Sequence, residues 1–215
     1  MKNEALKLHK LGLKVIPVGN DKMPKGRWKS FQDEQTTQDV EVIFFGHDES
    51  IALLTGHGIE VIDIDVKYFL EHHNITNIWD SIYYAVGAET FEKLLITRTM
   101  SGGFHVIYKT TVSEGNQKLA SRYTLDSEKK SEHDKIKVLL ETRGEGGYIL
   151  IPPSQGYSFD NPSITFENIP TLTDEQRNGI ISSCRSFDEI QETYTQTKAA
   201  IPIEVLGDGM STIEA

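Results

Sequence analysis

Hydrophobic and polar positions alternate along several short runs of the chain, and this alternation predicts strands. The runs are residues 13–18, 50–54, 59–66, 95–97, 104–109, 136–141 and 148–151. Successive side chains of a strand point to opposite faces of the sheet. In the run 59–66, Asp63 and Asp65 therefore project from one face, and Ile62 and Ile64 project from the other.

Other stretches have the three-to-four residue spacing of apolar positions, with capping residues beside them, that predicts helices. The expected helices lie between Asn3 and Gly12, after Thr37, within 67–95, near 174–184 and near 187–195. The polar stretch 111–135 is predicted to be a mobile helix–loop insertion, and residues 196–215 are predicted to be a linker. Because strands and helices are interleaved irregularly, the pattern favours an α+β fold over a repeating βαβ fold.

The length of 215 residues is sufficient for one well-packed domain. We expect that domain within residues 1–170, followed by an acidic helical tail and linker over 171–215. No apolar run approaches the roughly 20 residues that span a bilayer, and the charged N-terminus does not resemble a signal peptide. We therefore expect a cytoplasmic protein. Cys184 is the only cysteine, which excludes an internal disulfide and a multi-cysteine zinc site.

Charge is distributed unevenly along the chain. The net charge of −10 argues against a protein that coats nucleic acid by charge alone. Residues 1–30 nevertheless hold eight Lys/Arg and two acids, whereas residues 31–60 hold no Lys/Arg and seven acids. Residues 156–215 hold three Lys/Arg and ten acids. The basic N-terminal segment is either a solvated helix face or a local attractive field for phosphates.

Three short motifs have residue types that suit chemistry on a nucleotide. Asp63 and Asp65 are about 7 Å apart along one strand face, so they can share Mg²⁺ or Mn²⁺, which prefer oxygen ligands. If the strand merely ends there, both acids face water instead. The stretch Thr99 to His105 contains Ser101, Gly102 and Gly103, and its backbone amides can approach an anion closely. A plain glycine-rich hairpin turn is the alternative.

The third motif is a strand that ends in an acid. Glu141 follows the apolar residues 138–140, and Arg143 lies two positions further on, before a glycine-rich turn. A carboxylate from a separate strand can complete a metal cluster, and the planar guanidinium of Arg143 can bind a phosphate. The alternative is a surface strand end with an Arg143–Glu145 pair.

The order of these motifs resembles the N-terminal domain of bifunctional DNA primase/polymerases, in the archaeo-eukaryotic primase superfamily. The resemblance runs from Ala5 to about Tyr157. It also includes the stretches 12–18, 22–24 with Trp28, 54–56, and 147–154. The resemblance implies an RRM-like antiparallel sheet that carries the acids, packed beside a small N-terminal α/β unit.

The resemblance also implies roles for individual residues. Asp63, Asp65 and Glu141 would be the catalytic metal ligands, although the family often has Asp at the third position. Ser101 and His105 match the nucleotide-binding motif, to which we add Gly102, Gly103 and Arg143. Lys22 and Lys25 lie in the family's basic loop, and we predict that they and Arg27 bind nucleic acid.

We therefore expect a template-dependent primase/polymerase that uses Mg²⁺ or Mn²⁺, nucleoside triphosphates and a DNA template and primer. The family's usual arrangement implies a helicase module as partner, in the replication of a mobile element, phage or plasmid. A non-catalytic single-strand-binding module of a replication protein is one alternative. A nucleotidyltransferase that acts on DNA ends during repair is another.

Overall fold

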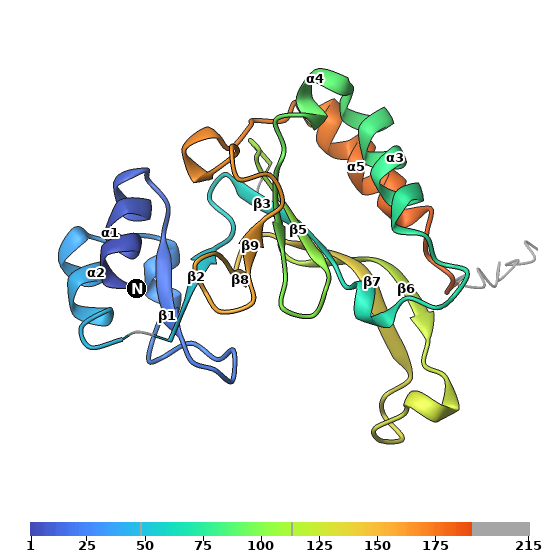
Figure 1. Ribbon diagram of the computed structural model, residues 1–215, viewed down its shortest axis with the longest axis horizontal. Coiled ribbons are helices and arrows are strands. Elements are labelled where there is room, and N and C mark those ends of the chain that lie inside the picture. The colour runs from blue at the N-terminus through green and yellow to red at the C-terminus, as the bar shows by residue number, and fades with distance from the viewer. Residues whose placement is uncertain (48, 113, 191–215) are drawn as a thin grey trace, which may run out of the picture.

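The computed structural model describes residues 1–47, 49–112 and 114–190, which form two antiparallel sheets with helices around them (Figure 1). The smaller sheet has the order β1 (Val15–Val18), β2 (Ser50–Leu54), β8 (Tyr148–Leu150). The larger sheet has the order β6 (Gln117–Tyr123), β7 (Ile136–Arg143), β3 (Ile59–Ile64), β5 (Phe104–Lys109), β4 (Leu95–Arg98), β9 (Ser158–Phe159). The predicted α+β class is therefore confirmed.

The helices fall into two groups. The α-helices are α1 (Lys2–Lys10), α2 (Thr37–Ile43), α3 (Ile75–Val86), α4 (Ala88–Phe91) and α5 (Asp174–Arg185). Short 3₁₀ turns are η1 (Lys29–Gln32), η2 (Val66–Tyr68), η3 (Asp126–Glu128) and η4 (Phe166–Asn168). Helices α1 and α2 lie beside the small sheet, whereas α3 and α5 lie side by side along the larger one (Figure 1).

Side-chain caps explain where two of these helices begin. Thr36 accepts a hydrogen bond from the backbone N–H of Asp39, and the Asp39 carboxylate accepts one from the backbone N–H of Thr36. Thr173 and Gln176 form the same reciprocal arrangement at the start of α5. Each cap satisfies backbone donors that have no partner within the helix.

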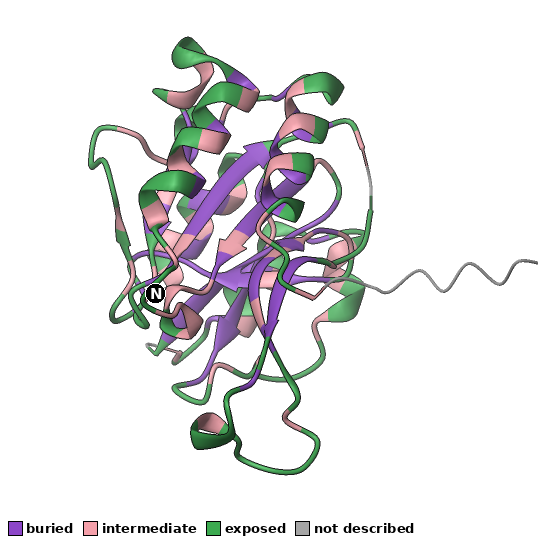
Figure 2. Ribbon diagram, turned by 90° about the vertical axis from the view of Figure 1, so that its right-hand side faces the viewer, coloured by how far each residue is buried: buried purple, intermediate pink, exposed green. Residues whose placement is uncertain are grey.

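The two faces of β3 enter different hydrophobic cores. Ile62 and Ile64 pack in the core that α3 and α5 cover, together with Ile82 and Ile180. On the opposite face, Val61 belongs to the core of the N-terminal unit, which contains residues of α1, α2, β1 and β2. Figure 2 shows the strands buried between these layers, while the outer helix surfaces and the loop joining β6 to β7 are exposed.

Several expectations about local structure are wrong. Residues 111–135 are not a helix–loop insertion, because they contain β6, the edge strand of the larger sheet. Asn3 does not cap α1, which begins after Met1. Residues 187–190 are not helical, and the rest of the helix expected at 187–195 and the linker at 196–215 lie outside the described residues.

The C-terminal helix α5 packs against α3 and the larger sheet, although it follows the predicted boundary at residue 170. The division into a domain over 1–170 and a tail over 171–215 stays a prediction. Among the described residues, no helix combines the length and the apolar composition needed to cross a membrane.

Candidate active site

A row of polar residues crosses the middle of the larger sheet. Asp63 on β3 is paired in register with Glu141 on β7 and with His105 on β5. His105 is paired in turn with Thr97 on β4. Residues paired in this way across antiparallel strands project from the same face of the sheet. Sheet register therefore brings together residues as far apart in the chain as Asp63 and Glu141, which are separated by 78 positions.

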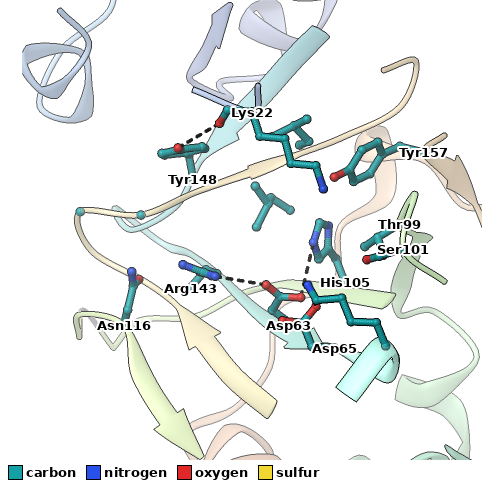
Figure 3. Close-up of a pocket in the computed structure, with 15 residues that line it drawn as sticks. Lys22, Asp63, Asp65, Thr99, Ser101, His105, Asn116, Arg143, Tyr148 and Tyr157 are labelled. Atoms are coloured by element: carbon teal, nitrogen blue, oxygen red, sulfur yellow. Dashed lines mark hydrogen bonds and ion pairs between the residues drawn. The ribbon is translucent and has the colours of Figure 1, made fainter. Parts of the chain in front are cut away.

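This row lies where the cover of the N-terminal unit ends. Val61 and Ile107, further along the same face, are buried in the core of that unit. Next to them a cavity of about 300 Å³ opens between the larger sheet and β8 (Figure 3). The lining residues include Lys22, Asp63, Asp65, Lys67, Thr99, Ser101, His105, Asn116, Arg143, Tyr148 and Tyr157. The face that is apolar at one end thus becomes a polar cavity at the other.

The three acids of the candidate metal site lie together. Asp63, Asp65 and Glu141 can each offer one carboxylate oxygen, and these oxygens lie within 4.8 Å of one another. All three side chains are mostly buried, with exposed fractions of 13%, 22% and 17%. Three converging carboxylates form an all-oxygen donor set, which fits a hard divalent cation such as Mg²⁺ or Mn²⁺.

Two basic side chains contact the same carboxylates. Arg143 pairs with Glu141 and lies 3.4 Å from Asp63, measured from Nη2 to Oδ2. Lys67 Nζ lies 2.7 Å from Asp65 Oδ1 and donates a hydrogen bond to it. Glu141 does not line the cavity, whereas Arg143, its partner, does. Each carboxylate therefore already has a cationic partner from the protein itself.

Burial and neighbouring charges shift several ionisation equilibria in the site. Burial raises the pKa of Glu141, helped by Asp63 and Asp65 and opposed by Arg143. Burial lowers the pKa of His105, and the charge of Asp63, 3.7 Å away, partly opposes this. This lowered pKa favours the neutral imidazole form of His105. Burial also raises the pKa of Tyr157, whose ring stacks on that of His105 with centroids 6.1 Å apart.

The turn between β4 and β5 is held close to the end of β3. The hydroxyl of Thr99 accepts a hydrogen bond from the backbone N–H of Gly103 at 3.0 Å and lies 3.2 Å from that of Ser101. Gly103 is in such close contact with Ile64 that a Cβ atom would overlap the Ile64 carbonyl oxygen. Thr99 and Ser101 thereby face the cavity that Asp63 and Asp65 line.

This close contact predicts a large difference between two adjacent glycines. Gly103→Ala forces the turn away from Ile64, and we expect a loss of about 3 kcal/mol in the free energy of unfolding, at the upper end of the range for overpacked sites. Gly102 has open space around it but a φ of +82°, so Gly102→Ala should cost only about 1 kcal/mol. Urea denaturation of both variants measures the difference, and equal losses would contradict the close-contact argument.

The predicted nucleic-acid residues separate into two groups. Lys22 lines the cavity, and its ammonium group points into it (Figure 3). Lys25 and Arg27 are exposed on the same loop and do not line the cavity. Lys25 Nζ lies 4.0 Å from Glu49 Oε2.

Sequence reasoning missed several cavity residues: Lys67, Asn116, Tyr148 and Tyr157. The sequence does carry a signal for Lys67, because a lysine two residues after Asp65 can reach that carboxylate. Asn116 accepts a hydrogen bond from the backbone N–H of Gly144, so it fixes the turn that follows Arg143. Nothing in the sequence around Asn116 indicates that contact.

A second cluster of potential metal ligands lies elsewhere, at His72, His73 and Glu189. His72 and His73 precede α3, and their ring centroids are only 4.2 Å apart. Both Nε2 atoms lie within 2.8 Å of Glu189 Oε1. The backbone N–H of Leu70 donates to His73 Nδ1, so the neutral His73 ring carries its proton on Nε2. His73 Nδ1 is therefore occupied by the Leu70 amide, and His73 Nε2 contacts Glu189 Oε1 at 2.6 Å without the geometry of a hydrogen bond.

Comparison with known sequences identifies the family to which this arrangement belongs. No curated protein matches the chain. The family model described as bifunctional DNA primase/polymerase, N-terminal, matches residues 5–172. The match spans both sheets, the acid cluster and the turn that ends in His105. The chain therefore belongs to the family of bifunctional DNA primase/polymerase N-terminal domains.

Proposed function

We propose that this protein is a template-dependent nucleotidyltransferase that adds nucleotides from nucleoside triphosphates to a DNA primer, with two divalent metal ions as cofactors. The convergence of Asp63, Asp65 and Glu141 beside a polar cavity carries the proposal. Membership of a primase/polymerase family supports the same activity and DNA as a partner.

The residues around the cavity would have two separate roles in the reaction, metal binding and phosphate binding. The primer 3′-hydroxyl would lose its proton to solvent, and its oxygen would form a bond to the α-phosphorus while the bond to pyrophosphate breaks. Asp63, Asp65 and Glu141 would hold Mg²⁺ or Mn²⁺, which would lower the pKa of the 3′-hydroxyl and stabilise the charge on the leaving pyrophosphate.

Residues of the turn between β4 and β5, which also line the cavity, would position the triphosphate. Ser101, His105 and the amides of the turn that contains Gly102 and Gly103 would donate hydrogen bonds to phosphate oxygens. Neutral His105 suits this role, because its ring retains one N–H donor. Arg143 would add a planar donor pair. Lys22, Lys25 and Arg27 would attract the strand through its phosphates, with base pairing supplying sequence information.

Several finer expectations rest on the resemblance. The RRM-like description of the larger sheet is consistent with helices α3 and α5 on one of its faces. The helicase partner, the mobile-element, phage or plasmid context and the cytoplasmic location stay predictions.

Two other functions remain as competing hypotheses. A binding module that only holds single-stranded nucleic acid would need neither the acid cluster nor a metal ion. A DNA-end-repair enzyme would use the same chemistry on a different acceptor. The cluster of three acids favours an enzyme over a binding module, because three like charges converge where Arg143 and Lys67 supply only two positive charges in direct contact.

The direct test is incorporation of labelled nucleotides by the wild-type chain. Primed, unprimed and broken-end DNA are each supplied with NTPs or dNTPs and with Mg²⁺, Mn²⁺ or EDTA. We expect metal-dependent extension of primed templates that EDTA abolishes. Preference for broken ends would favour the repair enzyme, and an inert protein that still binds single strands would favour the binding module.

A further inference from the structure

Lys67 is placed to interact with both the acid cluster and a bound triphosphate. Its ammonium group lies 2.7 Å from Asp65 Oδ1. The side chain also lines the cavity that contains Ser101 and His105. Lys67 lies in η2, shortly after the strand that carries Asp63, so the ordered backbone fixes the position of its Cα atom. Its four-carbon stem leaves the charged end free to move.

Contact with the carboxylate makes Lys67 a competitor of any cation that uses the same oxygen. Asp65 Oδ1 cannot give its full negative charge both to the ammonium group and to a divalent ion. When a divalent ion binds Asp65, repulsion between the two cations drives the ammonium group away. The side chain is 39% exposed, so water can replace the carboxylate as a partner of the ammonium group, which also contacts the Tyr68 ring at 4.7 Å from its centroid.

We propose that Lys67 is a movable counter-ion that neutralises Asp65 before metal binding and then binds a phosphate of the nucleoside triphosphate. This role rests on the proposed function and adds a nucleotide-positioning residue to it. The metal and the triphosphate arrive with opposite charges, so one lysine can serve the acid cluster first and the triphosphate afterwards. Net charge in the cavity thus stays closer to zero at each stage.

Arg143 is less suited to the same exchange. It contacts two of the three acids, Glu141 and Asp63, and it is anchored on β7 within the sheet. Lys67 has one carboxylate partner and a more exposed side chain. The lysine is therefore the more easily displaced of the two cations.

The proposal predicts opposite changes in two affinities. Lys67→Met should tighten Mn²⁺ binding by about three- to tenfold, because one partly exposed charge-assisted hydrogen bond no longer competes. The same variant should weaken binding of ATP and dATP, measured separately at saturating Mn²⁺, by about three- to tenfold. Electron paramagnetic resonance of free Mn²⁺ gives the first affinity, and equilibrium dialysis of labelled nucleotide gives the second.

Two further variants separate the ion pair from general charge effects. Lys67→Arg keeps the charge and should stay within about twofold of wild type in Mn²⁺ affinity. Lys22→Met removes a positive charge from the same cavity, but in the described part of the chain Lys22 has no ion pair with a carboxylate. It should weaken nucleotide binding and change Mn²⁺ affinity less than Lys67→Met does, since the interaction between charges falls with their distance.

The outcomes distinguish this inference from the proposed function. A purely structural role for Lys67 predicts that Lys67→Met weakens both affinities, and that result would overturn the inference while leaving the metal site intact. Unchanged Mn²⁺ affinity or unchanged nucleotide affinity would overturn it as well. Wild-type protein that binds no Mn²⁺ would overturn the proposed function and, with it, the role of Lys67.

Discussion

Asparagine at both Asp63 and Asp65 is expected to lower nucleotide incorporation by about a thousandfold or more. The two carboxylates supply two of the three converging oxygens of the cluster. Metal stabilisation of transition-state charge is worth several kcal/mol, and each 1.4 kcal/mol corresponds to about tenfold in rate. Asparagine keeps the size of the side chain but removes the charge, so primer-extension rates with Mn²⁺ report the loss of the metal ligands.

A matched variant controls for the change in net charge. Glu89→Gln with Asp126→Asn also removes two negative charges, from side chains that are 86% and 95% exposed. This control should extend primers at the wild-type rate. Single-strand binding should persist in both double variants. Activity of the Asp63/Asp65 variant within tenfold of wild type would show that these acids do not hold the catalytic metal.

The acid cluster could be predicted from sequence because strand alternation and register are simple rules. Alternation over residues 59–66 predicts that Asp63 and Asp65 lie on one face, opposite Ile62 and Ile64. In the structure β3 ends at Ile64 and Asp65 lies just beyond it, while Ile62 and Ile64 lie in the core beneath α3 and α5. The pairing of Asp63 with Glu141 was expected only from the order of the motifs and the family resemblance. Register between β3 and β7 depends on the whole sheet, which a local pattern does not specify.

Strand β6 was missed because its sequence, QKLASRY, does not have a clean alternation. Arg122 is the reason for part of this irregularity. Its guanidinium group is buried, donates to both carboxylate oxygens of Glu128 and also donates to the backbone carbonyl of Tyr68. From sequence alone an arginine is assigned to the surface, because arginine is rarely buried without a partner. A local sequence pattern cannot predict a partner such as Tyr68, which lies 54 positions away in the chain.

The largest expected loss of stability comes from a buried ion pair that local patterns also fail to reveal. Glu60, on the face of β3 opposite Asp63, is 2% exposed, and Arg177 of α5 is 3% exposed. Arg177 donates to both Glu60 oxygens, at 2.6 and 2.8 Å, and Tyr108 donates to one of them at 2.7 Å. The pair ties α5 to β3, the strand that carries Asp63.

Replacement of Arg177 by methionine should therefore reduce the free energy of unfolding by about 3–5 kcal/mol, because it leaves the Glu60 charge buried without its partner. The double variant Glu60→Gln with Arg177→Met removes both charges and should recover most of that loss, since a neutral amide is much cheaper to bury. Guanidinium denaturation of the two variants measures the difference. If the double variant is no more stable than Arg177→Met alone, the loss arises from the packing of α5 rather than from an uncompensated charge, and the ion pair is not what fixes α5 to β3.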